Sequence, residues 1–478
     1  MKELKMYIDG RFAANQSGKW IDVLNPSTEE VIAHMPDGTV EDVRSAINAA
    51  EKAQDAWEKL PPIRRAAYLT KIAGGIRARE KELTDIIVRE GGKTQALANV
   101  EVLFTADYLE YMAGWARRYE GEIIPSDRPN ESIFLFKKAI GVTTGILPWN
   151  FPFFLIARKA APALLTGNTI VIKPSQITPI NAYVFAQIAD EAGLPPGVFN
   201  LVNGRGSVIG HELAANPKVG MVSLTGSVEA GIQTMAAASA NVTKVSLELG
   251  GKAPGIVMPD ADLDLAVKSI IASRVINTGQ VCNCCERVYV HTSIQEAFLE
   301  KLTAGMKAVK AGNPAERADL DMGPLVEEAA LKSVQAKVEK AIAQGATLLL
   351  GGRRIGTKGY FFEPTILTGC TQDMDIIREE TFGPVLPVVA FSDTRDAIRW
   401  ANDCEYGLTS SVYTQNLDVA FQLIRALKFG ETYINRENFE AMQGFHAGWR
   451  KSGIGGADGK HGLEEYLQTH VVYLETKE

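Results

Sequence analysis

The stretch Gly141-Val142-Thr143-Thr144-Gly145-Ile146-Leu147 opens a series of short apolar runs that alternate with helix-length segments. The later apolar runs are Thr169–Ile172, Val198–Val202, Val219–Leu224 and Val245–Leu247, and the helical segments cover 153–166, 178–193, 205–215 and 229–240. Such alternation predicts a parallel, doubly wound sheet. Ligands bind at the carboxyl ends of the strands in these sheets, so the loops after the runs are the expected site of chemistry.

A second alternating series spans about 265 to 435 and predicts a second α/β domain. Its strand candidates are Arg287–Val290, Thr347–Leu350, Leu386–Phe391, Thr409–Tyr413 and Glu431–Ile434. Upstream, strand-like pieces at 6–8 and 20–23 precede amphipathic helices expected over 40–59, 62–80 and 97–119. The tail 468–474 is an isolated strand, and because a lone strand needs an edge to pair with, we expect a neighbouring subunit to supply one.

Composition restricts the classes of partner. The chain has 478 residues, 46% of them hydrophobic, and a net charge of -7 without basic blocks, which argues against a nucleic-acid or anionic-lipid surface. No apolar run reaches membrane-spanning length, and the start Met1-Lys2-Glu3-Leu4-Lys5 lacks the apolar run of a secretion signal. We therefore expect a cytoplasmic protein that binds small molecules.

Three of the five cysteines lie within Gly279-Gln280-Val281-Cys282-Asn283-Cys284-Cys285. The Cys-x-Cys-Cys spacing is too cramped for a usual zinc pair, and the six histidines form no His-x(3-5)-His unit, so no metal site is predicted. An odd cysteine count in a long chain also disfavours a disulfide framework. A reduced, reactive thiolate is the hypothesis that remains beside inert core packing.

Three strand ends carry groups suited to a nucleotide. Lys173-Pro174-Ser175-Gln176 offers an ammonium, a hydroxyl and an amide, while Gly204-Arg205-Gly206 and Thr225-Gly226-Ser227 each lead into a predicted helix. Helix N-termini bind phosphate through free N–H groups and the helix dipole. The 204–210 stretch, with Gly210 one turn on, departs from the dinucleotide fingerprint, so the joint placement of the three loops carries the argument.

Six motifs in order resemble the signature of the NAD(P)-dependent aldehyde dehydrogenase superfamily. They are Pro148-Trp149-Asn150-Phe151-Pro152, Lys173-Pro174-Ser175, Thr225-Gly226-Ser227, Leu247-Glu248-Leu249-Gly250-Gly251-Lys252, Gly279-Gln280-Val281-Cys282 and Glu380-Thr381-Phe382-Gly383-Pro384-Val385. Within the superfamily, 433–440 and 444–450 are most similar to bacterial members that oxidise lactaldehyde and glycolaldehyde.

The resemblance implies an aldehyde dehydrogenase-like α/β fold. A Rossmann-type, doubly wound cofactor domain is expected at 1–120 and 141–250, and an α/β catalytic domain at 251–450. A small β element for oligomerisation is expected at 121–140 and 451–478. The resemblance therefore also implies a homodimer or homotetramer that assembles through the C-terminal strand.

The resemblance assigns catalytic roles residue by residue. Cys282 is implied as the nucleophile and Glu248 as the general base, with an oxyanion hole formed by the Asn150 side chain and the Cys282 backbone N–H. A thiolate attacks the aldehyde carbon, hydride leaves to NAD, and a base-activated water hydrolyses the thioester. Because Glu248 stands between Leu247 and Leu249, we expect an apolar setting and a raised pKa, against the alternative of a salt-bridged carboxylate.

The resemblance also implies a set of cofactor contacts. Lys173 and Glu380 would hold the adenosine and nicotinamide riboses, with Ser227 near the pyrophosphate and Phe382 near the nicotinamide. The other implied contacts are Ile146, Pro148, Trp149, Ser175, Gln176, Gly206, Gly210, Gly226 and Leu249. Gln176 stands where NAD-preferring relatives usually carry glutamate, so the cofactor is expected to be NAD with weakened discrimination against NADP.

Polar residues replace aromatic ones along the expected substrate tunnel. Phe151 keeps one aromatic position, but Arg158, Glu440 and His446 stand where aromatic residues are common, and Asn283 follows the nucleophile. We hypothesise that these polar groups recognise the hydroxyl of a short 2-hydroxyaldehyde, since a site built for a hydroxyl rejects the deoxy analogue. The alternatives are an Arg158–Glu440 salt bridge that shapes the tunnel without touching substrate, and a general dehydrogenase of small aldehydes.

Two further function classes compete with a dehydrogenase. A thiol hydrolase or acyltransferase would need a positioned histidine, and no histidine lies in a motif matched to Cys282. Intact Cys282, Glu248 and Asn150 argue against an inactive scaffold. Ala457 and its neighbours lack a glutamate that some relatives place there, which makes a proton relay by that route doubtful.

Overall fold

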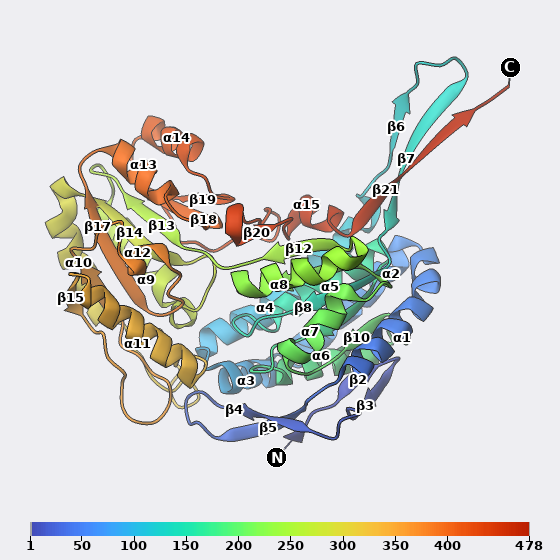
Figure 1. Cartoon of the computed structure of the whole chain (residues 1–478), viewed down its shortest axis with the longest axis horizontal. Helices are drawn as coiled ribbons and strands as arrows, with labels where there is room; N and C mark the ends of the chain where they lie inside the picture. Colours follow the sequence, from blue (N-terminus) through green and yellow to red (C-terminus); the bar gives the residue numbers. More distant parts are fainter. Residues whose placement is uncertain (1, 478) are drawn as a thin grey trace.

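Strand β8 (Val142–Ile146) is central to an eight-stranded sheet in the computed structural model, which describes residues 2–477 (Figure 1). The strand order is β20-β12-β11-β8-β9-β10-β2-β3. The parallel strands beside β8 are β9 (Thr169–Lys173), β10 (Phe199–Leu201), β11 (Val219–Thr225) and β12 (Lys244–Glu248). The chain first builds outward through β9 and β10 and then returns to β11 and β12. The order therefore reverses beside β8, and such a switch point opens a ligand crevice at the carboxyl ends.

Helices cover this sheet as the alternating pattern predicts. The crossover helices are α5 (Phe154–Thr166), α6 (Ile180–Glu191), α7 (Gly206–Ala215) and α8 (Val228–Ala238). Upstream lie α1 (Val40–Lys59), α2 (Pro62–Ala78), α3 (Glu80–Gly91) and α4 (Gln95–Ala113). The helix predicted over 97–119 is too long, because α4 ends at Ala113 and a 3-10 turn follows over Gly114–Arg117. The helix α3 was not predicted. Every residue of α5 is buried, so this helix lies inside the lobe.

Short strands precede these helices. β2 (Met6–Ile8) and β3 (Arg11–Ala13) extend the edge of the large sheet beyond β10. A separate three-stranded sheet joins β1 (Lys2–Glu3), β5 (Val31–Pro36) and β4 (Trp20–Leu24). The two predicted strand-like pieces therefore belong to different sheets.

A seven-stranded sheet forms the second lobe, in the order β15-β16-β17-β14-β13-β18-β19. Its strands are β13 (Ala253–Val257), β14 (Cys285–His291), β15 (Thr347–Leu350), β16 (Thr365–Thr368), β17 (Val385–Phe391), β18 (Thr409–Tyr413) and β19 (Glu431–Ile434). Its helices are α9 (Leu263–Val275), α10 (Gln295–Lys307), α11 (Glu328–Ala343), α12 (Asp375–Arg378), α13 (Thr394–Asn402) and α14 (Leu417–Ala426). All five predicted strands are present, and β13 and β16 are additional.

A β arm projects from the first lobe (Figure 1). It contains β6 (Glu122–Pro125), β7 (Glu131–Ala139) and the C-terminal β21 (Leu467–Glu475). The tail strand is not isolated within its own chain, because β21 pairs antiparallel with β7 along the whole of both strands; β21 is an edge strand of this sheet, and its pairing with a neighbouring subunit stays a prediction. Within 451–478, β20 (Gly453–Ile454) pairs instead with β12, and α15 (Gly459–Glu464) packs against α5.

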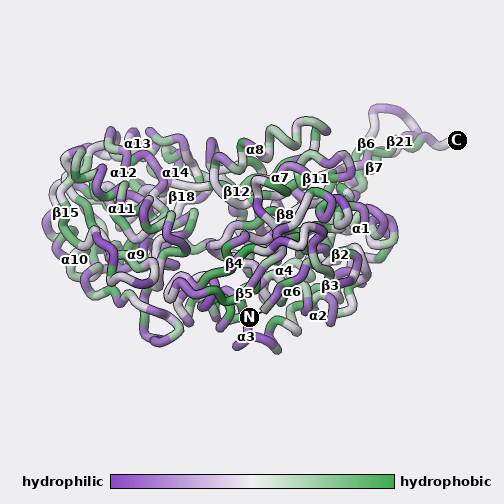
Figure 2. Tube along the Cα trace, turned by 60° about the horizontal axis from the view of Figure 1, so that its bottom comes forward, coloured by the Kyte–Doolittle hydropathy of each residue, from purple (hydrophilic) through white to green (hydrophobic). Residues whose placement is uncertain are grey.

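The hydropathy of the residues varies along the chain in both lobes and in the arm. Apolar and polar segments alternate through both lobes, and the loop at the tip of the arm is polar (Figure 2). Among residues 2–477, no helix is long and apolar enough to cross a membrane.

A buried ion pair secures the N-terminus of α5. Glu101 of α4 accepts hydrogen bonds from the backbone N–H groups of Phe153 and Phe154, and its other carboxylate oxygen pairs with Lys93. Both charged side chains are almost completely buried, and the Lys93 ammonium lies 3.6 Å from the centre of the Phe151 ring. A carboxylate at a helix N-terminus satisfies free N–H groups and the helix dipole, so this pair places the start of α5.

We predict that Glu101→Gln lowers the free energy of unfolding by about 3–5 kcal/mol, because it leaves the buried Lys93 ammonium without an anion. Urea unfolding measures the change. The control is Glu110→Gln on the same helix, whose exposed ion pair with Arg77 should contribute less than about 1 kcal/mol. Equal losses in the two variants would contradict the role of the Lys93–Glu101 pair.

Candidate active site

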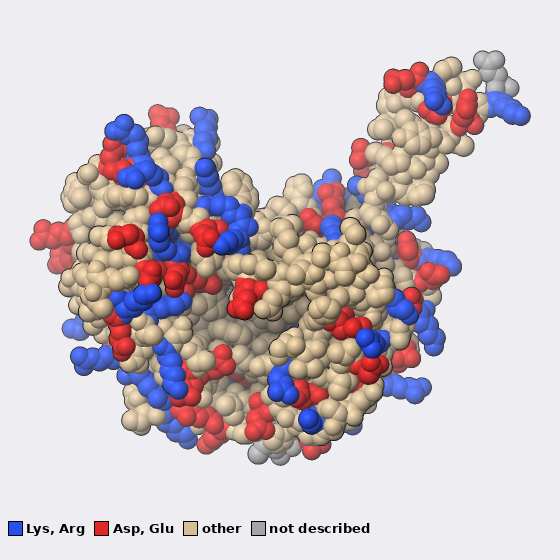
Figure 3. All heavy atoms as spheres, viewed as in Figure 1, with Lys and Arg blue, Asp and Glu red and all other residues tan. Residues whose placement is uncertain are grey.

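A cavity of about 560 Å³ opens at the carboxyl ends of the strands around β8. It lies where the surface is hollowed between the two lobes (Figure 3). Its walls include most of the predicted site residues: Ile146, Pro148, Trp149, Asn150, Phe151, Arg158, Lys173, Ser175, Gln176, Gly226, Ser227, Glu248, Leu249, Cys282, Asn283, Glu380, Phe382 and Glu440. Three predicted residues, Gly206, Gly210 and His446, are not among the lining residues.

Sequence reasoning missed another part of the wall. Phe104 of α4, Phe154 of α5 and Phe439 line the cavity together with Val100, Glu101 and Asn438. The Phe104 ring contacts both Phe154 and Phe439, at centroid distances of 4.8 and 5.9 Å. The only local signal is the helical spacing of Val100 and Phe104 on α4, and that spacing is equally typical of core packing. The aromatic share of the cavity is therefore larger than the motifs indicate.

The loop before β14 presents Cys282 to the cavity. Asn277 and Thr278 have φ of 47° and 60°, a left-handed conformation that is uncommon in residues with a side chain. Gln280 anchors the loop, since its side chain accepts from the Val326 N–H at 2.9 Å and donates to the Asn277 carbonyl at 2.9 Å. Cys282 remains partly exposed two residues later.

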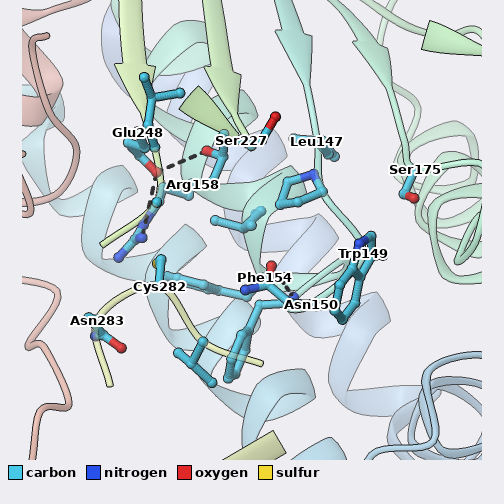
Figure 4. Close-up of a pocket in the computed structure, with 18 of the residues that line it drawn as sticks. Leu147, Trp149, Asn150, Phe154, Arg158, Ser175, Ser227, Glu248, Cys282 and Asn283 are labelled. Carbon is cyan, nitrogen blue, oxygen red and sulfur yellow. Dashed lines mark hydrogen bonds and ion pairs between the residues drawn. The ribbon is translucent and has the colours of Figure 1, made fainter. Parts of the chain in front are cut away.

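Asn150 lies against the same loop. Its side-chain amide donates to the Gln280 backbone carbonyl at 3.2 Å, and the backbone carbonyl of Asn150 accepts from the Asn277 side chain at 3.2 Å. These contacts join the end of β8 to the cysteine loop. Figure 4 shows Asn150 and Trp149 on one side of the pocket and Glu248 with Arg158 on the other.

The two neighbouring cysteines differ from Cys282. Cys284 and Cys285 are buried, and burial raises the pKa of each thiol to about 12. The Cys284 thiol donates to the Val281 carbonyl at 2.9 Å. Because the thiolate is the nucleophilic form, these two residues are unreactive at neutral pH.

Glu248 ends β12 among charged groups, contrary to the predicted apolar setting. Its carboxylate accepts from the Thr225 hydroxyl at 2.9 Å and lies 3.8 Å from the Arg158 guanidinium. Burial alone would raise the pKa of Glu248, but the Lys159, Arg158 and His446 side chains and the Thr225 hydrogen bond lower it below the ordinary value. The expectation of a raised pKa is therefore wrong, and Glu248 is an ionised base at neutral pH.

Arg158 is the centre of a buried charge cluster. Its guanidinium donates to both carboxylate oxygens of Asp458, at 3.1 and 2.6 Å, and to Glu440 at 2.9 Å. The Arg158–Glu440 salt bridge, one of the two predicted alternatives, is thus present. Glu440 is the more exposed partner, with 18% of its side chain accessible, and its second oxygen accepts from the Asn283 amide.

Asp458 adopts a strained backbone conformation to reach Arg158. Its φ of 72° and ψ of 163° lie in a region that almost only glycine occupies, at a typical cost of about 1–3 kcal/mol. Burial raises the pKa of this carboxyl to about 6 despite the neighbouring guanidinium. No local pattern in the sequence distinguishes Asp458 from the adjacent Ala457 as a residue of the site.

His446 is buried, and its ring Nδ1 lies 2.6 Å from the Glu431 carboxylate. It is not among the residues that line the cavity, and its predicted place in the substrate tunnel stays a prediction.

The other half of the cavity has the chemistry of a nucleotide site. Lys173 is buried, and its ammonium donates to the carbonyl of Pro174. Burial lowers the pKa of Lys173 to about 8. No carboxylate in the described residues 2–477 forms an ion pair with this side chain. Ser227 caps the N-terminus of α8. A ribose hydroxyl and a phosphate are the acceptors that such donors suit.

Glu380 and Phe382 close the cavity from the second lobe. Glu380 accepts from the Gly251 N–H at 2.8 Å, and burial raises its pKa to about 7. Phe382, with φ of 54°, meets Trp149 edge to face at 5.5 Å. A Cβ added at Gly206 or Gly210 would meet no atom within 4 Å, so protein packing does not explain those glycines.

In the described part of the chain, no group of three or more His, Cys, Asp or Glu side chains is arranged to hold a metal ion.

Comparison with known proteins identifies the family. The family model described as "Aldehyde dehydrogenase family" matches residues 12–472. The chain belongs to the aldehyde dehydrogenase family. It is therefore an oxidoreductase of a family that oxidises aldehydes with NAD(P), which confirms the resemblance and the predicted fold class.

Individual relatives cover nearly the whole of this aldehyde dehydrogenase. It is 67% identical to the lactaldehyde dehydrogenase of Escherichia coli (strain K12), over 98% of either chain. The crystal structure of that E. coli enzyme superposes with a TM-score of 0.98 at 66% identity, covering 99% of both chains. A 3,6-anhydro-L-galactose dehydrogenase solved in complex with NAP has a TM-score of 0.97 at 42% identity, covering 99% of this chain and 100% of that one.

Proposed function

We propose that this protein oxidises a short 2-hydroxyaldehyde, such as lactaldehyde or glycolaldehyde, to the carboxylic acid with NAD. The observation that carries the proposal is the polar group formed by Glu440, Asn283 and Arg158 in a cavity that aromatic residues also line. The similarity to the E. coli lactaldehyde dehydrogenase supports the same substrate class.

In the proposed mechanism Cys282 is the nucleophile. Its thiolate attacks the aldehyde carbon, and the Asn150 amide and the Cys282 backbone N–H stabilise the oxyanion that forms. When bound, the nicotinamide supplies the acceptor for the hydride that leaves this carbon. Glu248 then removes a proton from the water that hydrolyses the thioester. The ionised state of Glu248 suits this role, because a base must be unprotonated before it acts.

The charge cluster favours a neutral substrate over an anionic one. Asp458, Glu440 and Glu248 surround Arg158, so the guanidinium has no uncompensated positive charge to offer a carboxylate. Glu440, the partly exposed member, can instead accept a hydrogen bond from a substrate hydroxyl. A hydroxyl donor therefore fits this wall better than the acid group of a semialdehyde.

We predict that kcat/KM for lactaldehyde or glycolaldehyde exceeds that for propanal by at least about 100-fold, because the deoxy analogue has no hydroxyl to donate to Glu440. The readout is NADH absorbance with a panel of short aldehydes, and Cys282→Ser is the blank. Equal values would instead establish a general dehydrogenase of small aldehydes. No reduction with any aldehyde would refute dehydrogenase activity.

The cofactor preference is proposed to depend on Gln176, which lies in the cavity wall after β9. An amide does not repel a 2'-phosphate, whereas a carboxylate would. We predict that Gln176→Glu raises the NAD:NADP ratio of kcat/KM at least about tenfold. The exposed Gln335→Glu on α11 is the control, and an unchanged ratio in Gln176→Glu would refute the assignment.

Assembly is proposed to use the arm and the face of α8. Phe136 and Tyr473 of the arm are 48% and 66% exposed, and Ile232 of α8 is 58% exposed. The surface over α8 carries few charges in Figure 3, whereas charges of both signs cover much of the remaining visible surface. Exposed apolar patches of this kind are typical of subunit interfaces.

We predict a homodimer or homotetramer by light scattering, and a smaller assembly for the Phe136→Asp/Tyr473→Asp variant, since two buried charges would destabilise the interface. Leu417→Asp on α14, at another exposed apolar residue, is the control. A monomeric parent protein would refute the proposal.

A further inference from the structure

A second buried group of charged side chains lies behind the cavity wall that Glu380 and Phe382 form. Its members are Glu286 of β14, Lys252 before β13 and Arg274 of α9, and none of their side chains is more than 1% exposed. The proposed mechanism does not use them, and they are not among the residues that line the cavity. An effect of this group on the reaction must therefore pass through the residues that do line it.

Glu286 is the shared acceptor of the group. One of its carboxylate oxygens lies 2.7 Å from the Lys252 ammonium, and the other lies 2.9 Å from the Arg274 guanidinium. Burial alone would raise the pKa of Glu286, but the two cations and the hydrogen bonds to the carboxylate lower it to about 2. The carboxylate is therefore ionised at neutral pH, and both of its oxygens act as acceptors.

The same carboxylate holds the loop that carries Glu380 and Phe382. Its two oxygens accept from the backbone N–H groups of Thr381, at 2.9 Å, and of Phe382, at 3.0 Å. Lys252 donates to the Thr381 hydroxyl at 3.1 Å. The φ of 54° at Phe382 is costly for a residue with a side chain and persists only where the surroundings impose it. Glu286 thus fixes the backbone of this loop at two consecutive residues.

Arg274 connects Glu286 to the cysteine loop. Its guanidinium donates to the backbone carbonyl of Cys285 at 3.0 Å and to that of Gly279. These two carbonyls lie on either side of Cys282 in the sequence, so Arg274 holds both ends of the segment that presents the sulfur. One buried carboxylate and its cations therefore join two walls of the cavity.

The topology of the second sheet explains why these segments meet. β13, β14 and β17 are neighbouring parallel strands, so the loops that enter them lie at one edge of the sheet. Lys252, Glu286 and the stretch 381–382 stand close to the starts of these three strands. The entering loops of β14 and β17 also touch directly, since a Cβ added at Gly279 would collide with the Gly383 carbonyl.

We propose that Glu286 is a positioning residue that holds Glu380 and Phe382 in a fixed place relative to the nucleophile Cys282. The carboxylate touches neither substrate nor cofactor, and it acts through the backbone of the two loops. The inference rests on the proposed function, in which Glu380 and Phe382 contact the nicotinamide riboside. Such alignment matters because a displacement of about 1 Å can lower a rate about 100-fold.

Glu286→Gln tests the role with little change of shape. A carboxylate offers two acceptor oxygens, whereas an amide offers one and turns a donor towards the second N–H group. The variant can therefore accept from Thr381 or from Phe382, but not from both. Because it also leaves Lys252 and Arg274 short of an anion, the double variant Glu286→Gln/Lys252→Met, which keeps the net charge of the group, is made beside it.

Isothermal titration of the full-length protein with NAD and with ADP measures the positioning effect without aldehyde. ADP lacks the nicotinamide riboside, so its binding reports the adenosine side of the cavity. We expect Glu286→Gln to raise the Kd for NAD at least about fivefold and to leave the Kd for ADP within about twofold, which corresponds to the loss of about one hydrogen bond. Glu379→Gln, at the exposed residue before Glu380, removes the same charge and should change neither Kd.

A single-turnover measurement tests the alignment with Cys282. With enzyme in excess over aldehyde and saturating NAD, the rate constant for NADH formation should fall at least about tenfold in Glu286→Gln. A merely structural role would lower the amplitude, because fewer molecules are folded, and would leave the rate constant unchanged. An unchanged rate constant would overturn the alignment with the nucleophile.

The binding data have their own contrary outcomes. An unchanged Kd for NAD in the folded variant, or an equal rise for NAD and ADP, overturns the positioning role. If Glu286→Gln does not fold, as judged by circular dichroism, the charge-balanced double variant provides the same test. A parent protein that forms no NADH with any aldehyde would refute the proposed function, whereas the difference between NAD and ADP would still report on Glu286 by itself.

Discussion

The buried guanidinium of Arg158 is the interaction on which the site depends. A buried cation is costly unless it is paired and hydrogen-bonded, and this one is satisfied by Asp458, Glu440 and Glu248 together. The carboxylates come from β12, the 435–449 loop and the start of α15, whereas Arg158 belongs to the fully buried α5. The cluster therefore connects the cofactor-side sheet to the segments that close the substrate cavity.

The same cluster sets the protonation of the reactive groups. With Arg158, Lys159 and His446 nearby, Glu248 is ionised, and the buried Lys159 has its pKa lowered to about 8. The Lys159 ammonium donates to Ser223 at 2.9 Å, one strand away from Glu248. One network of opposite charges thus supplies an ionised base, a protonated imidazole and a neutral binding wall. Removing Asp458 would take away the carboxylate that accepts two hydrogen bonds from the buried Arg158, which explains why the strain at Asp458 is tolerated.

Sequence patterns predicted the parts of the structure that depend on local information. The alternation around β8, the crossover helices and the motif residues from Pro148 to Phe382 correspond closely to the strands and cavity walls observed. The motifs also bring Cys282, Glu248 and Asn150 to one cavity, because each stands at or near the end of a strand or before one. Residue-level roles for these three remain predictions.

Contacts between distant segments were not predictable from the same patterns. Asp458 meets Arg158 only after the chain has folded, so no spacing in the sequence marks this pair. The flanking leucines of Glu248 indicated an apolar setting, but alternate residues of a strand face opposite sides, so its neighbours in sequence are not its neighbours in space. The sequence pattern did not reveal the partner of the tail strand, because that partner, β7, is more than three hundred residues upstream.

The ratio of kcat/KM for lactaldehyde over propanal in Glu440→Gln tests the central claim most directly. The substitution keeps the shape of the wall and leaves Arg158 paired with Asp458, while it replaces the charged acceptor proposed for the substrate hydroxyl by a weaker, neutral amide oxygen. We expect this ratio to fall at least about tenfold, because kcat/KM for lactaldehyde decreases while kcat/KM for propanal does not increase. Equal losses for both aldehydes, with the ratio preserved, would show that Glu440 shapes the cavity without recognising the hydroxyl.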